Sequence, residues 1–192
     1  MVLVNYATNK VNCKIVYCGT GESGKTTNLT YIYDQVNSCI RSEMTSLEGM
    51  NERTLFFDFF SIDLGKIKGF TTSFGLYTAP GQKEYNAARK LVLNGVDGIV
   101  FVADSKAEKR YENIESMKIL KENLREYGFS LEKIPLILQY NKRDYHNILS
   151  LDSLEKDLNE YGFPSFEAVA TKGTGVFATL KAMSNLILSS LQ

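Results

Sequence analysis

Residues 19–26 read Gly-Thr-Gly-Glu-Ser-Gly-Lys-Thr, which is the pattern G-x-x-x-x-G-K-T. An apolar run, residues 13–18, precedes this stretch and predicts a buried strand, and residues 26–36 after it predict a helix. A glycine-rich bend at this place turns backbone N–H groups toward phosphate oxygens, and the helix N-terminus adds its positive dipole end. The lysine of the pattern reaches the β- and γ-phosphates, and the threonine hydroxyl holds Mg²⁺. We therefore predict a phosphate-binding P-loop; the alternative is an ordinary glycine-rich turn before a helix.

The composition limits the class of protein. The chain has 192 residues with 22 acidic and 22 basic side chains, so no net charge favours nucleic acid or an anionic membrane as a partner. Three cysteines and one histidine are too few for a disulfide framework or a zinc site. No apolar stretch has the length of a membrane span, and the termini carry no signal-peptide or lipidation pattern. We expect one cytoplasmic domain, residues 1–192, without a nucleic-acid partner or a direct membrane anchor.

Strand and helix patterns alternate along the chain. Apolar runs predict buried strands at residues 99–103, 134–140 and 166–169, and residues 2–6 predict a short strand at the start. Residues 54–63 and 70–77, joined by a turn at 64–69, predict a hairpin. Helical spacing predicts helices at residues 114–127, 151–158 and 176–191. Their apolar faces are expected to include Ile114, Met117, Leu120, Leu124, Tyr127 and Phe177. This order predicts a three-layer α/β fold with a mostly parallel sheet and one antiparallel hairpin strand.

Four more segments follow strands, at the edge where such sheets bind ligands. They are Arg53-Thr54, Thr78-Ala79-Pro80-Gly81-Gln82, Asn141-Lys142-Arg143-Asp144 and Ala170-Thr171-Lys172-Gly173. In this order and spacing the chain resembles a small Ras-like GTPase along nearly its whole length. The resemblance implies the small G-protein fold of P-loop NTPases, GTP or GDP with Mg²⁺ as ligands, a first switch at about 37–54 and a second at about 78–95.

The resemblance also assigns roles at the two ends of the nucleotide. Asn141 and Asp144 would read guanine, the Lys142 stem would cover it, and a backbone N–H near Thr171 would contact its carbonyl. By itself Asn141-Lys142-Arg143-Asp144 could also be a solvated turn. The predicted nucleotide-binding residues are Gly19, Gly21, Glu22, Ser23, Gly24, Lys25, Thr26, Thr27, Thr54, Gly81, Asn141, Lys142, Asp144, Ala170, Thr171 and Lys172.

At the phosphate end, Gln82 would orient the attacking water and Gly81 N–H would bind the γ-phosphate. Thr26 and Thr54 would be the metal ligands, and the Thr54 contact would exist only with GTP bound, which makes the protein a switch. Catalysis would fall to Gln82, Lys25 and Arg53. Any side chain at Gly21 would crowd the glutamine.

Two departures from the Ras pattern narrow the resemblance. Thr78 stands where the family usually has an aspartate that holds Mg²⁺ through water, and Arg53 directly precedes the switch threonine. Both features resemble the bacterial polarity GTPases of gliding and twitching motility. That resemblance implies slow hydrolysis and makes Arg53 an arginine finger supplied by the same chain; a solvated loop arginine is the alternative.

The same resemblance implies partners and a place in the cell. A homodimeric Roadblock-type activator would bring Arg53 and Gln82 into position while the central hairpin strand shifts register. Further partners would be polarity and motility effectors, which could recruit the cytoplasmic protein to a cell pole. None of these partners is identified by a residue of the chain.

Two side chains lie outside the family pattern. Asp58 is an acid flanked by Phe57 and Phe59 in an aromatic strand, and it could supply the carboxylate missing at Thr78; a solvent-facing position is the other reading. Asp104, at the end of a buried strand, is expected to cap the next helix.

Two rival functions remain open. A P-loop kinase would need an arginine-rich lid and an acceptor pocket, and neither residues 37–53 nor the segments after Asp144 supply one. A nucleotide-binding scaffold without turnover is compatible with Thr78, whereas Gln82, Lys25 and Thr26 argue against it.

Overall fold

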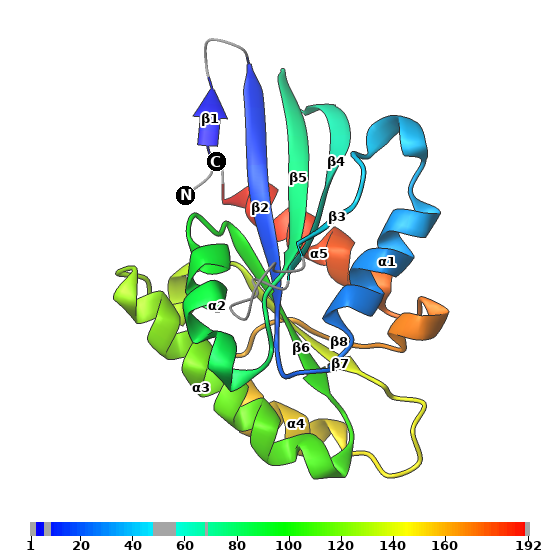
Figure 1. Cartoon of the computed structure of the whole chain (residues 1–192), viewed down its shortest axis with the longest axis vertical. Coiled ribbons are helices and arrows are strands. Elements are labelled where there is room, and N and C mark those ends of the chain that lie inside the picture. Colours follow the sequence, from blue (N-terminus) through cyan, green and yellow to red (C-terminus); the bar gives the residue numbers. More distant parts are fainter. Residues whose placement is uncertain (1–2, 6–8, 48–56, 68, 191–192) are drawn as a thin grey trace.

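An eight-stranded sheet forms the centre of the protein (Figure 1). The structure is a computed structural model and describes residues 3–5, 9–47, 57–67 and 69–190. The strand order is β3-β4-β5-β2-β6-β7-β8, and β1 pairs with β2. The strands are β1 Leu3–Asn5, β2 Lys10–Cys18, β3 Thr45–Leu47, β4 Phe57–Ile67, β5 Phe70–Thr78, β6 Gly98–Asp104, β7 Leu136–Asn141 and β8 Ser165–Glu167.

The pairing of the strands confirms a mostly parallel sheet. Strands β5, β2, β6, β7 and β8 pair in parallel, and β4 pairs antiparallel with β5, as the hairpin predicts. Two short antiparallel strands come in addition to the predicted one: β3 extends the sheet beyond β4, and β1 pairs with the start of β2. The predicted short strand at residues 2–6 is confirmed over Leu3–Asn5.

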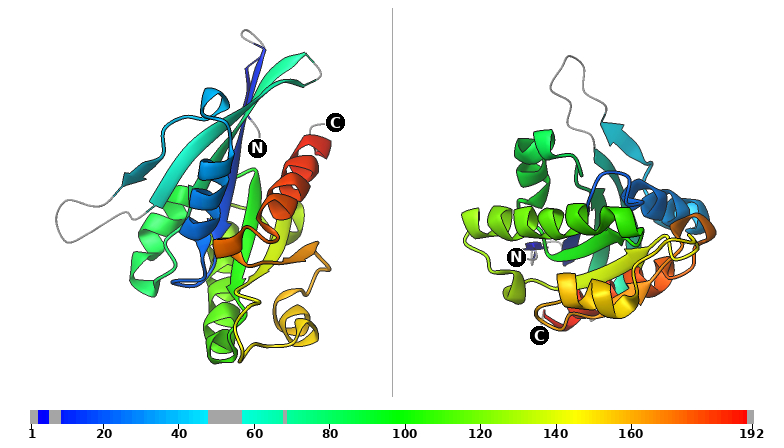
Figure 2. Two further views of the ribbon diagram at one scale, coloured as in Figure 1. Left: turned by 90° about the vertical axis from the view of Figure 1, so that its right-hand side faces the viewer. Right: turned by 90° about the horizontal axis from the view of Figure 1, so that it is seen from below.

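Helices cover both faces of the sheet and so make the expected three layers (Figures 1 and 2). They are α1 Lys25–Gln35, α2 Asn86–Leu93, α3 Arg110–Glu126, α4 Leu151–Leu158 and α5 Val176–Ser189, with short 3₁₀ turns at Ser38–Ile40, Lys83–Tyr85, Ala107–Lys109, Leu131–Lys133 and Ala170–Lys172. Helices α1 and α5 pack on one face, and α2, α3 and α4 on the other. The start of β2, the end of β4 and the start of β5 project beyond the helices.

Strand β6 explains why the central apolar runs are continuous. Ile99 and Phe101 contribute to the core under α2, α3 and α4, whereas Val100 and Val102 contribute to the core under α1 and α5. All four side chains are fully buried. Because successive side chains point to opposite faces, a strand covered on both sides needs apolar residues at every position.

The apolar faces of two helices differ from the sequence prediction. Met117, Leu120 and Leu124 of α3 are buried as expected, but Ile114, Tyr127 and Phe177 are 39%, 37% and 41% exposed. In α3 a polar residue, Asn113, takes the inward place that Ile114 was expected to take. The Asn113 amide bonds the backbone N–H and C=O of Asp104 at 3.0 and 2.8 Å, so it completes the hydrogen bonding at the end of β6.

The predicted turn at residues 64–69 is also shorter than expected. Strand β4 continues to Ile67, and its register against β5 shifts between Asp63 and Lys66. Gly65 allows this irregularity because its backbone is left-handed, with φ 72°, and its N–H donates to the Asp63 carboxylate at 2.7 Å. The predicted strand residues 54–56 lie outside the described part of the chain.

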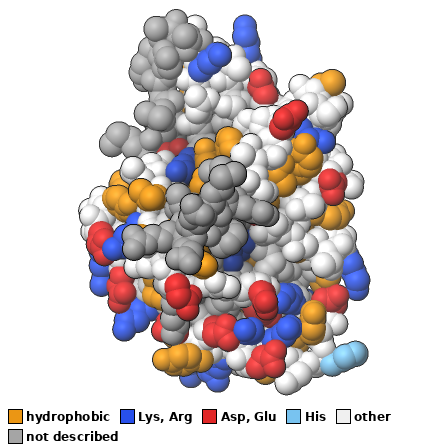
Figure 3. All heavy atoms as spheres, viewed as in Figure 1, with side chains coloured by type: hydrophobic (Ala, Val, Ile, Leu, Met, Phe, Trp, Pro, Cys, Tyr) orange, Lys and Arg blue, Asp and Glu red, His pale blue; other side chains and the backbone are white. Residues whose placement is uncertain are grey.

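Charged side chains of both signs are interspersed over the face drawn in Figure 3, in keeping with the balanced composition. Within the described ranges, no helix is both long and apolar enough to cross a bilayer.

Candidate functional site

The carboxyl ends of the parallel strands meet at one edge of the sheet. There β2 ends at Cys18, β5 at Thr78, β6 at Asp104 and β7 at Asn141. The ends of these strands, the loops that follow them, the first turn of α1 and the 3₁₀ turn Ala170–Lys172 after β8 hold every site residue predicted from the sequence except Arg53 and Thr54. Those two residues lie outside the described part of the chain, so their roles remain predictions.

The P-loop backbone needs its first and last glycines. Gly19 and Gly24 have φ values of 137° and 99°, in the region that L side chains rarely adopt. A Cβ on Gly19 would lie 2.1 Å from the Val102 carbonyl oxygen, and one on Gly24 would lie 2.2 Å from Asn141 Nδ2. The glycines therefore allow the loop to pack closely against β6 and against the last residue of β7.

Lys25, the first residue of α1, extends under the P-loop. Its side chain is buried, and Nζ donates to the carbonyl oxygens of Gly19 and Thr20. Burial above all, together with the nearby charges of Arg89 and Lys142, lowers the Lys25 pKa from 10.5 to about 8. A buried ammonium whose partners are neutral carbonyls is stabilised by any anion that comes within reach, and a phosphate is such an anion.

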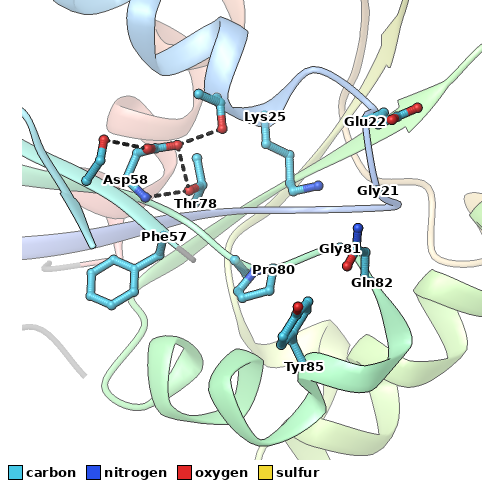
Figure 4. Close-up of a pocket in the computed structure, with 13 residues that line it drawn as sticks. Gly21, Glu22, Lys25, Phe57, Asp58, Thr78, Pro80, Gly81, Gln82 and Tyr85 are labelled. Atoms are coloured by element: carbon cyan, nitrogen blue, oxygen red, sulfur yellow. Dashed lines mark hydrogen bonds between the residues drawn. The ribbon is translucent and has the colours of Figure 1, made fainter. Parts of the chain in front are cut away.

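A cavity of about 590 Å³ opens beside this ammonium group (Figure 4). Its walls come from three places: the P-loop and the start of α1, strands β3 and β4, and the segment after β5. The lining residues are Gly21, Glu22, Lys25, Thr26, Ser46, Phe57, Asp58, Thr78, Ala79, Pro80, Gly81, Gln82 and Tyr85. Of the predicted phosphate-binding and metal-binding residues, Gly21, Glu22, Lys25, Thr26 and Gly81 therefore converge with Gln82 on one space.

The second predicted switch lies directly against the P-loop. A Cβ on Gly81 would come within 2.4 Å of Gly21 N and 2.5 Å of the Thr20 carbonyl oxygen, so only glycine permits this approach. A Cβ on Gly21 would lie 3.7 Å from Gln82 Cγ, which is ordinary van der Waals contact. The predicted crowding at position 21 therefore has to come from atoms beyond Cβ.

Arg89 of α2 holds this switch and is not among the residues predicted from the sequence. Its guanidinium is buried and donates to the carbonyl oxygens of Pro80 and Gln82, at 2.9 and 2.8 Å, and to Asn86 Oδ1 at 3.0 Å. The described chain shows no carboxylate paired with it. In the sequence Arg89 stands out only as a basic residue on the apolar face of a helix. That position does not reveal which groups it contacts.

Asp58 lies at the metal end of the cavity. Its Oδ2 accepts a hydrogen bond of 2.6 Å from the hydroxyl of Thr26, the predicted Mg²⁺ ligand, and one of 3.2 Å from the hydroxyl of Thr78. The predicted proximity of Asp58 to the metal-side residues is thus present in the structure, and the alternative of a purely solvent-facing side chain is wrong.

At the base end, Asn141 joins two loops. It is buried; its Nδ2 donates to the Ser23 carbonyl at 2.8 Å, and its Oδ1 accepts from Ala170 N–H at 2.9 Å. Its described bonds therefore brace the P-loop and the Ala170–Lys172 turn. The Ala170 N–H donates to Asn141 Oδ1, and the Lys172 N–H donates to the Val169 carbonyl. Of the three N–H groups of this turn, that of Thr171 is therefore the candidate for the predicted contact with the base carbonyl.

Lys142 and Asp144 complete the base end. Lys142 has a left-handed backbone, with φ 66°, and its Nζ pairs at 2.7 Å with the fully buried carboxylate of Asp104. Asp104 also accepts from Lys106 N–H at 3.0 Å. The prediction that it caps the next helix is wrong, because the cap positions of the 3₁₀ turn and of α3 are Lys106 and Lys109. Its anchoring of the Lys142 stem was not predicted. Asp144 is partly exposed and pairs with Lys172 at 3.3 Å.

Thr27 lies on the α1 side of the same edge. It lines a second hollow of about 370 Å³ between α1 and the turn after β8, which it shares with Thr26, Ala170 and Thr171. Glu22 takes a left-handed backbone, with φ 61°, at the bend of the P-loop.

These residues fit a magnesium-bound nucleoside phosphate. The glycines of the P-loop lie so close to other groups that side chains would not fit in their place. Lys25 brings a buried positive charge whose described hydrogen-bond partners are neutral carbonyls. Among the described residues, the buried hydroxyls of Thr20 and Ser23 have no protein partner. Mg²⁺ prefers hydroxyl, carboxylate and phosphate oxygens, which Thr26 and its neighbour Asp58 provide in part. The fold and this edge define a P-loop nucleotide-binding protein.

Comparison with known proteins fixes the family. Residues 14–189 match the model of the Ras family, and the chain belongs to that family. Ras-type proteins bind GTP or GDP with Mg²⁺ and hydrolyse GTP, so this chain is a Ras-like GTPase. The chain is also 50% identical over 192 residues to the Mutual gliding-motility protein MglA of Myxococcus xanthus (strain DK1622), covering 100% of this chain and 98% of that protein. Both resemblances predicted from the sequence are thereby confirmed.

Proposed function

We propose that this protein is a GTP-binding switch that hydrolyses GTP slowly and signals cell polarity and motility through state-dependent partners. The observation that carries the proposal is the convergence of the P-loop, Gln82 and the Asn141–Asp144 loop on one edge of the sheet, in a chain 50% identical to MglA. The proposed role in motility comes from the name of that relative. The proposed switch function comes from the residues at the carboxyl edge of the sheet.

Guanine selection rests on Asp144. A carboxylate there accepts from the ring N–H and the exocyclic amine of guanine, whereas adenine lacks that pair of donors. The Asp104–Lys142 ion pair and the two side-chain hydrogen bonds of Asn141 hold the surrounding loop in place. They therefore reduce the conformational entropy that is lost when the base binds. The described partner of Asp144, Lys172, would have to share or release the carboxylate.

Hydrolysis rests on the residues around the γ-phosphate. Lys25 and the P-loop amides hold the phosphates and spread their negative charge, Gly81 N–H contacts the γ-phosphate, and Gln82 orients the attacking water. The bound Mg²⁺, held by Thr26 and Thr54, would neutralise charge on the β- and γ-oxygens. Arg53 would add a further positive charge at the γ-phosphate as an arginine finger from the same chain.

Turnover is slow in this proposal because Arg53 and Gln82 reach their working positions only with an activator. The partner expected from the resemblance is a homodimer of the Roadblock type, with polarity and motility effectors binding the GTP state. The protein would be cytoplasmic and recruited to a cell pole through such partners.

A scaffold that binds nucleotide without turnover is the second candidate. The observation that favours it is Thr78, which brings a hydroxyl where a carboxylate usually serves the metal, so the charge at position 78 is missing.

Two measurements test these proposals. Thermal unfolding with GTP, GDP or ATP, each with Mg²⁺, should show stabilisation by the guanine nucleotides only; stabilisation by ATP alone would overturn the guanine assignment. Single-turnover phosphate release should be slow for the chain alone and should accelerate by about 10³-fold or more with a Roadblock-type dimer. Tight GTP binding with no release under either condition would establish the scaffold instead.

A further inference from the structure

Helix α1 and strand β4 are joined at the metal end of the cavity by one side-chain pair. The Thr26 hydroxyl donates to Asp58 Oδ2 at 2.6 Å (Figure 4). Thr26 is the second residue of α1 and Asp58 the second residue of β4, 32 positions apart in the chain. The pair therefore forms only when the strand has its observed position beside the helix.

Three further hydrogen bonds fix the Asp58 residue. The Ser46 hydroxyl donates to Oδ1 at 2.9 Å and the Thr78 hydroxyl donates to Oδ2 at 3.2 Å. The Asp58 backbone N–H in turn donates to Thr78 Oγ1 at 2.8 Å. The carboxylate is thus surrounded by hydroxyl donors, and Thr78, which stands at the usual place of a metal-side acid, is oriented toward Asp58.

The strand register selects Asp58 for this position. Phe57 and Phe59 both contact the Tyr77 ring, with centroids 6.4 and 4.4 Å away, whereas Asp58 points to the opposite face of the sheet. Because side chains alternate along a strand, a shift of one residue would present a phenylalanine to Thr26. An acid between phenylalanines is therefore held on the α1 face by the packing of its neighbours.

The chemistry of a metal-bound hydroxyl explains why an acid belongs there. When a threonine oxygen coordinates Mg²⁺ through a lone pair, its proton needs an acceptor, and an anionic acceptor both fixes the hydroxyl and strengthens its oxygen as a ligand. Asp58 is that acceptor for Thr26. Of the two acids that line the cavity, the other, Glu22, points away from this end in Figure 4.

We propose that Asp58 replaces, from β4, the metal-side carboxylate that Thr78 lacks, and acts as the positioning residue for the Thr26 hydroxyl and the Mg²⁺ it binds. The inference rests on the proposed function, since it requires that the site takes a magnesium nucleotide. It also removes the main argument for the scaffold, because the negative charge missing at position 78 is supplied from the neighbouring strand.

The test is the Mg²⁺ dependence of nucleotide dissociation, which is read without any hydrolysis. A fluorescent GDP analogue is loaded, and its release rate is measured over a series of free Mg²⁺ concentrations and in excess EDTA. For Asp58→Asn we expect the Mg²⁺ concentration at half effect to rise by roughly 10- to 100-fold, with the rate in EDTA unchanged. Asp63→Asn, the same change at an exposed position of the same strand, should behave as wild type.

A charge exchange distinguishes metal positioning from a structural tie between α1 and β4. In Asp58→Thr/Thr78→Asp the carboxylate moves to the neighbouring strand, and the Mg²⁺ dependence should return to within about threefold of wild type. This variant also provides the answer if Asp58→Asn does not fold. An unchanged half-effect concentration in Asp58→Asn, or no recovery in the exchange variant, would overturn the role of Asp58. Wild-type protein whose nucleotide release ignores Mg²⁺ would overturn the proposed site itself, together with this inference.

Discussion

The Arg89 guanidinium lies 2.8 Å from the carbonyl oxygen of Gln82, so a buried positive charge on α2 holds the backbone of the residue expected to orient the attacking water. The same group holds the Pro80 carbonyl at 2.9 Å. Two carbonyls on either side of Gly81 are therefore fixed by one side chain. Because the guanidinium fork is planar and has five donors, it can hold both at once, which an ammonium cannot do as well.

Arg89→Met should loosen the second switch. The carbonyls of Pro80 and Gln82 lose their buried donor, so we expect the free energy of unfolding to fall by about 2–4 kcal/mol. Activator-stimulated hydrolysis should fall by roughly 10- to 100-fold, because the glutamine is no longer held in position. Urea unfolding and single-turnover phosphate release measure the two effects.

The matched control is the next residue. Lys90→Met removes an exposed ion pair with Glu126 and should change the free energy of unfolding by less than about 1 kcal/mol. If the Arg89 and Lys90 variants behaved alike, the guanidinium would have no special function at the switch.

Substitutions at Gly21 should have graded effects. A Cβ there lies at ordinary contact distance from Gln82 Cγ, and Gly21 does not have a left-handed backbone. Gly21→Ala should therefore keep hydrolysis within about fivefold of wild type, while the branched Gly21→Val should displace Gln82 and slow it by roughly 100-fold or more with GTP still bound. Phosphate release from preloaded protein is the measurement. Equal rates for both variants and wild type would show that Gln82 does not act at this place.

The buried thiol of Cys18 should make stability depend on alkaline pH. Burial raises its pKa from 9.0 to about 12, so the unfolded chain releases this proton at lower pH than the native protein does. The resulting stabilisation is fully present below pH 9 and is lost between pH 9 and 12. The advantage of wild type over Cys18→Ala in free energy of unfolding should shrink by about 2 kcal/mol between pH 8 and pH 10.5.

Thiol labelling gives an independent check on the same residue. At pH 8 the exposed Cys39 should react with an alkylating reagent, while Cys18 should react only after denaturation. A pH-independent difference between wild type and Cys18→Ala, or rapid labelling of native Cys18, would contradict the burial.

Local patterns allowed most of the fold to be predicted from the sequence. The P-loop is one continuous segment whose glycines, lysine and threonine act through backbone geometry, so its pattern is visible without tertiary contacts. The apolar run of β6 is visible for a similar reason, because both its faces are covered.

Residues whose partners are distant in the chain could not be predicted in the same way. Nothing near Arg89 announces that it bonds Gln82, and Asp104 meets Lys142 from 38 positions away. Asn113 replaced Ile114 on the inward face of α3 because the end of β6 needed a polar partner, a demand set by tertiary structure. Asp58 was recognisable as unusual among phenylalanines, but its hydrogen bond from the Thr26 hydroxyl depends on the register of β4.

Lys25 separates the requirements of folding from those of the site. Its ammonium is buried among carbonyls, and lowering its pKa from 10.5 to about 8 corresponds to about 3 kcal/mol of unfavourable burial of charge. Lys25→Met removes that cost together with the bonds to Gly19 and Thr20, which contribute about 1–2 kcal/mol. The nucleotide-free variant should therefore be as stable as wild type or up to about 2 kcal/mol more stable.

When nucleotide is bound, wild type should be more stable than Lys25→Met. GDP with Mg²⁺ should stabilise wild type strongly and Lys25→Met by at least about 2 kcal/mol less, because the variant has lost the cation that meets the phosphates. Urea unfolding with and without nucleotide measures both effects, and the exposed Lys181→Met should follow wild type in each. A nucleotide-free Lys25→Met protein less stable than wild type by 2 kcal/mol or more would mean that the ammonium serves the fold first, because its carbonyl bonds would then outweigh its desolvation.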